Sequence, residues 1–310
     1  MKGLLAAAAY LLFPGGLFVV VGSLAYEYVD RKLIARFQNR IGPRWFQPLA
    51  DFVKLMVKEE IIPQGVNAGL FVWLPAVALS AALAAALYVP MAGLNPTWSF
   101  RGDVVATVYL LMMMTLCIGL AGANTADRFS VIGAVRALTQ LFSYEAPFLL
   151  ALLGPAVATG SWKIAEINIY AQGRLWMIVT QPFGFIVALI GLMGKLELSP
   201  FDAPEAETEI VSGALTEYSG RGLAFFRLGR DIELFVGLTL ISAFYLGGLA
   251  NPLQFLVKTL ALLFVTAGLQ SLFARLRIDQ TVGLWWRIGA LLALVQLLIL
   301  IGLKAAGVSL

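Results

Sequence analysis

Residues 195–221 read Lys195-Leu-Glu-Leu-Ser-Pro-Phe-Asp-Ala-Pro-Glu-Ala-Glu-Thr-Glu-Ile-Val-Ser-Gly-Ala-Leu-Thr-Glu-Tyr-Ser-Gly-Arg221, and the organisation of the chain follows from this stretch. A third of the 18 acidic residues lie here: Glu197, Asp202, Glu205, Glu207, Glu209 and Glu217. Apolar runs long enough to cross a membrane flank the stretch on both sides. An acidic cluster at a membrane surface has to be solvated, paired or used, so we interpret it as a functional site.

The composition predicts an all-α polytopic membrane protein that forms one membrane domain over residues 1–310. The protein is 60% hydrophobic and 13% charged, against about 25% charged in a soluble domain. The first apolar run is long enough to span, so we expect a helix there and no cleavable signal peptide. Windows of about 20 apolar residues predict eight spans: 4–26, 70–92, 104–126, 133–160, 175–195, 232–250, 253–273 and 284–307.

The distribution of Lys and Arg predicts the orientation. Sixteen of the 22 basic residues lie between odd-numbered spans and the next even-numbered ones, or at the adjoining helix starts. The positive-inside rule therefore predicts that the loops 27–69 and 196–231 are cytoplasmic and that both termini lie outside.

The scarcity of metal-binding residues restricts the chemistry. The sequence contains no His and one Cys, Cys117, which we expect to be a packing residue. Iron–sulfur clusters and structural zinc need several Cys or His ligands, and haem usually needs an axial His, Met or Cys. We therefore expect no cofactor in this protein, and any proton path has to use carboxylates, Tyr, Lys, backbone or water.

Two surface segments show helical patterns. Gln47–Ile61 has an apolar face at three-and-four spacing, with Asp51 and Lys54 on its polar side, which predicts an amphipathic helix. It either lies flat at the membrane surface or forms a wall of a lateral opening. Ala203–Ile210 also resembles a helix, with Asp202 and Glu205 spaced as in a capping box.

Within that second helix, Glu205 and Glu209 would share a face while Glu207 points elsewhere. Repulsion between the two carboxylates would raise the pKa of at least one and suit proton uptake. The alternative is structural: helix capping by Asp202, and salt bridges from the other carboxylates to the basic loop.

The predicted span 133–160 carries one intramembrane acid, Glu145. Arg136, near the cytoplasmic end, begins a polar stripe that continues through Gln140 and Ser143 or Tyr144. Glu145 lies nine residues beyond Arg136, about 13 Å deeper at 1.5 Å per residue. A buried carboxylate there predicts a proton-carrying role, with a structural salt bridge as the alternative.

The motifs resemble subunit 1 of respiratory complex I. The stretch Pro200-Phe-Asp-Ala-Pro-Glu-Ala-Glu-Thr-Glu209, followed by Glu217-Tyr-Ser-Gly220, is similar to that family's signature. Three further blocks resemble the family in the same order: Asp30-Arg-Lys32 through Arg36-Phe-Gln-Asn-Arg-Ile-Gly-Pro43, Gly133-Ala-Val-Arg136 through Ser143-Tyr-Glu145, and Arg275-Leu-Arg-Ile-Asp-Gln280. The resemblance covers nearly the whole sequence.

This resemblance implies a subunit that joins a membrane arm to a peripheral redox arm. It implies that five acids match the family's proton path: Glu145, Glu205, Glu207, Glu209 and Glu217. Glu197, Asp202 and Tyr218 would support the acidic loop. Charge partners and the interface with the peripheral arm would come from six basic residues: Arg31, Arg36, Arg40, Arg44, Arg136 and Lys195.

Three departures distinguish this sequence from the quinone-type members of the family. Glu197 and Leu198 stand where those members usually have an Asn-Arg pair, and the segment after Pro43 is shorter. The last loop also lacks a Thr-Leu-Pro-Arg lead-in. These features resemble the membrane anchors of group 4 nickel–iron hydrogenases and their sulfur-reducing relatives.

The resemblance therefore implies particular partners in a prokaryotic cell membrane. Those are a peripheral iron–sulfur subunit, a hydrogenase-like large subunit and Mrp-type antiporter-like subunits, within the lipid bilayer and without nucleic acid. Iron–sulfur clusters and a nickel–iron centre would lie in the partners. The alternatives are the quinone-site subunit of a quinone oxidoreductase, an independent secondary transporter, and a passive anchor.

Overall fold

The computed structural model describes residues 10–172 and 177–306, and all regular structure in those residues is helical, which confirms the all-α prediction. The helices are α2 Gly16–Phe37, α3 Gln47–Val57, α4 Ala68–Ala86, α5 Asp103–Ala123, α6 Arg128–Thr159, α7 Ile164–Ala171, α8 Met177–Thr180, α9 Pro182–Lys195, α10 Glu207–Ile210, α11 Gly220–Tyr245, α12 Pro252–Leu272, α13 Ile278–Leu284 and α14 Ala290–Ala305. A 3-10 turn, Gly213–Leu215, precedes α11, and a π turn, Trp285–Gly289, joins α13 to α14.

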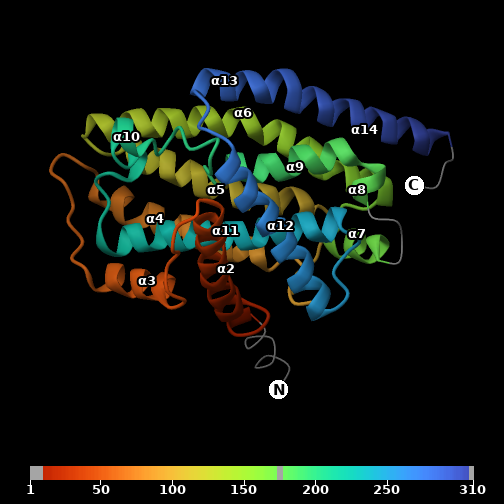
Figure 1. The fold of residues 1–310 in the computed structure, drawn as a ribbon, viewed down its shortest axis with the longest axis horizontal. Coiled ribbons are helices and arrows are strands. Elements are labelled where there is room, and N and C mark those ends of the chain that lie inside the picture. The colour runs from red at the N-terminus through yellow and green to blue at the C-terminus, as the bar shows by residue number, and fades with distance from the viewer. Residues whose placement is uncertain (1–9, 173–176, 307–310) are drawn as a thin grey trace.

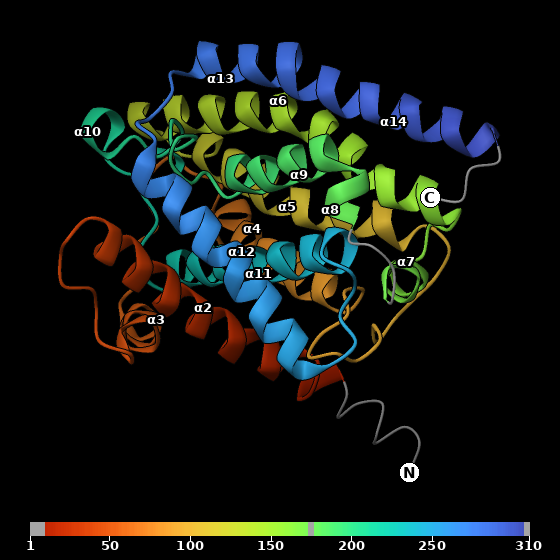
Figure 2. The same cartoon turned by 45° about the vertical axis from the view of Figure 1, so that its right-hand side comes forward.

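The long helices form a bundle around α11. In Figure 1, α4, α5, α6, α9 and α14 run along the long axis, while α2 and α12 cross them at a steep angle. Figure 2 shows the same crossing from another side. Helix α11 packs against α2, α3, α4, α9 and α12. Every residue from Ile232 to Tyr245 is buried, so this helix forms the centre of the core.

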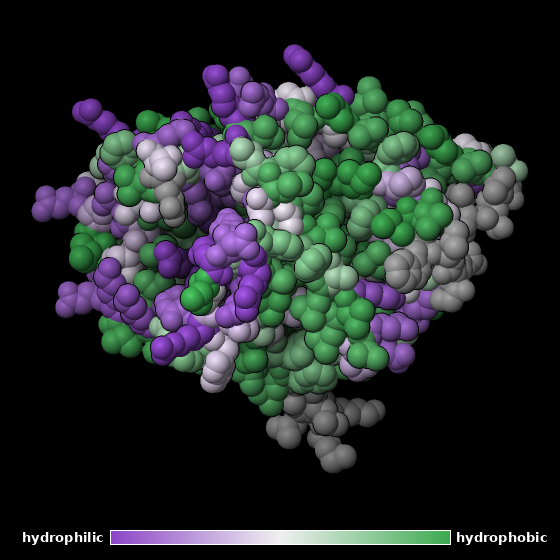
Figure 3. Space-filling model, in the orientation of Figure 1, coloured by the Kyte–Doolittle hydropathy of each residue, from purple (hydrophilic) through white to green (hydrophobic). Residues whose placement is uncertain are grey.

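Five helical stretches are long and apolar enough to cross a membrane: α4, α5, α6, α12 and the continuous run from α13 to α14. They correspond to five of the eight predicted spans. Large apolar side chains point outward from them, as Trp73, Leu253 and Leu298 do. Figure 3 shows hydrophilic residues gathered at one end of the molecule and hydrophobic residues over much of the remaining visible surface. The chain is therefore a polytopic membrane protein.

The other three predicted spans have different boundaries in the structure. Residues 4–9 and 173–176 lie outside the described part. Helix α2 continues to Phe37, so the predicted loop 27–69 begins as helix. Helix α11 begins at Gly220, so the last twelve residues of the predicted loop 196–231 are helical in the structure. A hydropathy window stops at charged residues, whereas a helix continues through them because Arg and Glu are good helix formers.

The predicted span 175–195 is also broken. Helix α8 ends at Thr180, and α9 starts at Pro182, where the missing N–H of proline costs no helical hydrogen bond. Gln181 between them is 1% exposed. Cys117 is buried among apolar side chains of α4, α5 and α11, as expected for a packing residue.

Candidate functional site

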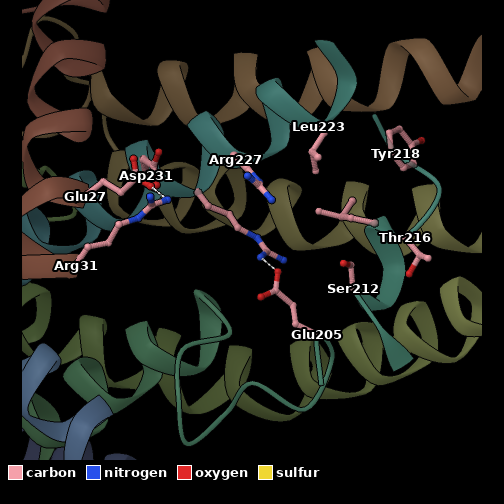
Figure 4. A pocket seen from close by; sticks show the side chains of 11 residues that line it. Glu27, Arg31, Glu205, Ser212, Thr216, Tyr218, Leu223, Arg227 and Asp231 are labelled. Atoms are coloured by element: carbon pink, nitrogen blue, oxygen red, sulfur yellow. Dashed lines mark hydrogen bonds and ion pairs between the residues drawn. The ribbon is translucent and has the colours of Figure 1, made fainter. Parts of the chain in front are cut away.

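A polar cavity of about 300 Å³ lies between α2, α11 and the acidic segment, near the hydrophilic end of the molecule. Figure 4 shows its side chains converging from these three elements. The lining residues are Glu27, Arg31, Glu205, Ser212, Leu215, Thr216, Tyr218, Leu223, Arg227, Arg230 and Asp231. Six of these side chains are charged, so the cavity is suited to water and ions rather than to an apolar ligand.

Arg230 organises the wall of the cavity. Its Nη1 pairs with Glu205, and its Nη2 lies 2.5 Å from Oε2 of Glu197. Two carboxylates from the acidic segment are thereby attached to α11. The sequence predicted that Glu205 shares a helix face with Glu209, with salt bridges to the basic loop as the alternative; in the structure Glu205 pairs with Arg230 instead. The partner comes from α11, which begins well before the span predicted there.

Glu197 is buried beside this arginine. Its side chain is 3% exposed, and burial raises its pKa to about 7, although the guanidinium of Arg230 acts in the opposite direction. A carboxyl with this pKa exchanges its proton near neutral pH. The sequence predicted only a supporting role for Glu197, because burial of a residue after a helix end is not visible in a hydropathy window.

Three ionisable side chains meet in the core below the cavity. Nζ of Lys195 lies 3.6 Å from Oε2 of Glu145 and 3.8 Å from Oε1 of Glu233. The side chains of Lys195 and Glu233 are almost fully buried, and that of Glu145 is 13% exposed. The ring of Tyr144 lies 5.6 Å from the Lys195 ammonium, within the range of a cation–π contact.

This core triad refines two expectations. Lys195 was predicted to be a charge partner or part of the interface with a peripheral arm. It pairs with Glu145 and Glu233 and is therefore a charge partner, and its side chain is too deeply buried for the interface. Glu145 was the only acid placed unambiguously within a predicted span, and Glu233 was not singled out because it lies at the edge of the predicted span 232–250. The sequence did hold a signal: Arg230, Asp231 and Glu233 form a charge cluster inside a run that is otherwise helical and increasingly apolar.

Helix α11 connects the cavity with the triad. Arg230 and Glu233 are three residues apart and therefore neighbours on one helix face. The cavity, the Arg230 pairs and the triad thus form a row of ionisable groups from the hydrophilic end into the core. Such a row can carry protons between carboxylates where water bridges the gaps.

The acidic segment itself is less helical than predicted. Helix α10 is a single turn that begins at Glu207, and no side chain caps it, so the Asp202–Glu205 capping box is absent. Oε2 of Glu209 lies 2.9 Å from Nη1 of Arg136, and Arg275 binds its other oxygen. Hydrogen bonding by Arg136 and the nearby charge of Arg275 lower the pKa of Glu209, so Glu209 is not a carboxyl whose pKa is raised by repulsion from Glu205.

The remaining acidic-segment residues are only partly brought together. Asp202 is half-buried, and the side chain of Glu207 lies outside the described part of the structure. Glu217 is half-buried and does not line the cavity. Tyr218 does line it; its ring stacks on Phe71 at 4.1 Å, and burial raises its pKa.

The basic residues divide into two groups. Arg31 binds Glu27 and lies 3.2 Å from Asp51, so it belongs to the cavity wall, and Arg136 binds Glu209. The side chains of Arg36, Arg40 and Arg44 are exposed near the end of α2 and beyond it. Their interface role stays a prediction.

The amphipathic helix is present as α3 and ends at Val57, four residues earlier than predicted. It packs against α2 and α11. Asp51 accepts hydrogen bonds from Arg31 and Gln47, while Lys54 is exposed. The hollow between α3, α2 and α11 measures about 20 Å³, roughly the size of one water molecule.

Comparisons with known proteins agree with this architecture. A family model described as NADH dehydrogenase matches residues 10–301. The chain is 33% identical over 293 residues to the H subunit of NADH-quinone oxidoreductase from Bacillus cytotoxicus, and the match covers 88% of this chain and 86% of that one. It is 33% identical over 305 residues to an H subunit of the same enzyme from Geobacter metallireducens, covering 91% and 92%.

Among solved structures, the chain is similar to one from the membrane-bound sulfane sulfur reductase, an archaeal respiratory membrane complex. The TM-score is 0.84 at 26% identity, and the match covers 92% of this chain and 96% of that one. The chain therefore belongs to the NADH dehydrogenase family that contains the H subunit of NADH-quinone oxidoreductase, as its sequence motifs indicated.

Proposed function

We propose that this chain is the coupling subunit of a redox-driven, ion-translocating membrane complex. It would link a hydrogenase-like peripheral iron–sulfur arm to translocation of H⁺ or Na⁺. The observation that carries the proposal is the row of ionisable groups from the cavity through Arg230 to the triad Glu145–Lys195–Glu233. Burying three charges in a membrane core is costly unless the protein uses them.

The proposed path uses the acids in an order given by their positions. Glu205 at the cavity and the buried Glu197 share Arg230, and Glu233 leads to Lys195 and Glu145. A change of charge near the cavity would shift Arg230 between its two carboxylates and so alter the field at the triad. Glu207, Glu209 and Glu217 would act at the entrance, where Glu209 is held by Arg136 and Arg275.

The alternative is that the cavity binds a quinone. The 33% identity to quinone oxidoreductase subunits favours it. The lining disfavours it, because six of eleven lining residues are charged and a quinone ring with its tail needs mostly apolar contacts. The resemblance to the solved sulfur reductase supports the hydrogenase-like or sulfur-reducing branch. We propose that the cofactors of the complex lie in partner subunits.

We further propose eight spans in one membrane domain, with both termini outside and the hydrophilic end in the cytoplasm of a prokaryotic cell. The basic side chains Arg36, Arg40 and Arg44 are exposed at this end and would meet the peripheral arm. Antiporter-like subunits would continue the ion path sideways from the triad. Ion transport by this chain alone, without other subunits, would instead indicate an independent transporter.

The central experiment is the Glu145→Gln variant of the intact complex, measured in sealed vesicles. The substitution keeps the size of the side chain and removes its titration. We expect electron transfer to persist at the wild-type rate when an uncoupler is present, while ion translocation per electron falls by at least about tenfold, the effect typical of losing a group that transfers protons. Full stoichiometry of translocation in the variant would contradict the proposed path.

Glu166→Gln is the matched control. Glu166 is an exposed acid on α7 that pairs with Lys163 at 2.9 Å and lies outside the row of ionisable groups. Its variant should translocate like wild type. Metal analysis of the same preparation, together with quinone reductase activity, separates the branches: nickel favours the hydrogenase-like interpretation, and quinone reduction without nickel favours the alternative.

A further inference from the structure

A second polar hollow shares no lining residue with the cavity described above. It has a volume of about 390 Å³ and lies where the start of α6, the loop after α12 and the start of α13 meet. Its charged lining residues are Arg136, Glu209, Arg275, Arg277 and Asp279. Three guanidinium groups face two carboxylates, so the hollow keeps a net positive charge.

Arg277 is the most accessible of these cations. Its side chain is 82% exposed and pairs with Asp279 at 3.4 Å, whereas Arg136 and Arg275 share Glu209. An exposed ion pair of this kind contributes little to stability. The guanidinium of Arg277 can therefore leave Asp279 and bind another anion at a small cost in free energy. A phosphate group suits it, because arginine binds phosphate through two parallel hydrogen bonds.

An apolar groove adjoins the basic hollow. It measures about 310 Å³ and lies between α9, the end of α12 and α13. Its lining is apolar throughout and includes Met193, Leu269, Phe273 and Leu284. Leu272 beside it is 77% exposed, as expected for a side chain that faces lipid.

One residue separates the two spaces. Leu276 lines both the basic hollow and the apolar groove. Its backbone N–H donates a hydrogen bond of 2.9 Å to the carbonyl of Pro200, which holds the loop against the start of the acidic segment. The end of α12 and the start of α13 are accordingly close together in Figure 2. A ligand that occupied both spaces would need a charged end and a long apolar part.

We propose that an anionic phospholipid binds here, with its phosphate in the Arg136–Arg275–Arg277 hollow and an acyl chain in the groove. The protein lies in a membrane, so its surroundings supply such a ligand. Basic pockets beside membrane-spanning helices attract anionic headgroups. A peptide would bring backbone donors and acceptors that the apolar groove cannot satisfy, and free phosphate would leave the groove unused.

The test is lipid binding to the intact, delipidated complex, measured by native mass spectrometry. The probes are dioleoyl phosphatidylglycerol, dioleoyl phosphatidylcholine and inorganic phosphate. We expect one tightly retained phosphatidylglycerol, weaker phosphatidylcholine binding, and no displacement by millimolar phosphate. Displacement by phosphate, or equal retention of both lipids, would overturn the proposal, because the first shows a free-anion site and the second shows no headgroup recognition.

Two variants examine the two halves of the site. One basic residue near the membrane contributes about 1 kcal/mol to binding of an anionic lipid, so Arg277→Gln should weaken phosphatidylglycerol binding about fivefold and leave phosphatidylcholine unchanged. Ala274 lines the groove on an exposed loop, so Ala274→Trp should weaken binding of both lipids without disturbing a helix.

Arg287→Gln removes the same charge from an exposed position that does not line the hollow, and it serves as the control. Its phosphatidylglycerol binding should equal that of wild type. An equal loss in the Arg287→Gln and Arg277→Gln variants would show general surface electrostatics and overturn the site. So would wild-type lipid binding in both the Arg277→Gln and Ala274→Trp variants.

Discussion

Glu197 combines burial with an ion pair, and its titration leads to a prediction for stability. Burial raises the pKa of Glu197 to about 7, from an ordinary value of 4.5. The folded protein therefore binds an extra proton between these pH values. Its contribution to stability is full below pH 4.5 and is lost as the pH rises through 7. The loss is on the order of 3 kcal/mol for a shift of this size.

The Glu197→Gln variant should lack this contribution to the pH dependence. We expect wild-type protein to lose more of its free energy of unfolding than the variant does as the pH rises from the ordinary pKa of a glutamate to above the folded value. The measurement is denaturant unfolding in detergent at several pH values, comparing wild type with variant at each one. Parallel curves for the two proteins would show that Glu197 does not titrate in this range.

Glu209 should behave in the opposite way, since Arg136 and Arg275 lower its pKa. Its stabilising contribution is present above the ordinary pKa and is lost as the pH falls through the folded value. The Glu209→Gln variant should therefore be less stable than wild type at neutral pH and approach wild-type stability in acid. The same unfolding series measures both variants, so each serves as a reference for the other.

At the residue scale, the sequence located the acids but not their partners. Glu145 stood out because a carboxylate within an apolar run is rare. Its contact with Lys195 joins residues far apart in the sequence, and no periodicity within one helix reveals such a contact. The pairing of Glu205 and Glu197 with Arg230 could not be predicted for the same reason. These ion pairs form because the acidic segment packs against α11, and that packing depends on the whole fold.

At the element scale, α6 approaches the acidic segment closely only because residue 133 is a glycine and has no Cβ. A Cβ at Gly133 would lie 2.3 Å from the backbone N of Ala214, in the 3-10 turn that follows α10. Gly133→Ala should therefore displace the turn and destabilise the protein by about 1–3 kcal/mol, the usual cost of overpacking. Thermal unfolding in detergent measures the change.

Gly283→Ala provides the matched comparison for that experiment. Gly283 lies inside α13, and nothing stands within 4 Å of the position that a Cβ would take. Alanine is the better helix former by about 1 kcal/mol, so this variant should be as stable as wild type or slightly more so. Equal effects of the two substitutions would exclude a steric role for the close approach at Gly133.

The elements themselves were largely predictable, whereas their ends were not. Long apolar windows identified α4, α5, α6 and α12 because burial in lipid requires about 20 apolar residues. The windows did not predict that α2 extends to Phe37 or that α11 begins at Gly220, because the extra turns carry charged residues that pair inside the protein. The short helix α7 was not predicted, because eight residues are too few for a clear periodic signal.

For the whole molecule, the distribution of basic residues predicts which end faces the cytoplasm. In a Cys117→Ser background, Asn95→Cys should react with an impermeant maleimide in intact cells. Lys54→Cys should react only after the membrane is opened. Both positions are exposed: Lys54 lies in α3, which precedes α4 in the sequence, and Asn95 lies in the loop that follows α4. Labelling of the Lys54→Cys variant in intact cells would reverse the proposed orientation, and the unsubstituted Cys117→Ser protein measures background labelling.

The position of the Lys195 ammonium has a consequence for the whole molecule. Its distances to the two glutamates differ by so little that the two Coulomb energies differ by only ~0.2 kcal/mol at an effective dielectric constant of about 20. That difference is smaller than thermal energy, so the two distances favour neither glutamate strongly. A weak external field can therefore shift the ammonium group toward one carboxylate or the other. An event at a distant redox centre would then need to supply a bias, and not the full work of breaking an ion pair.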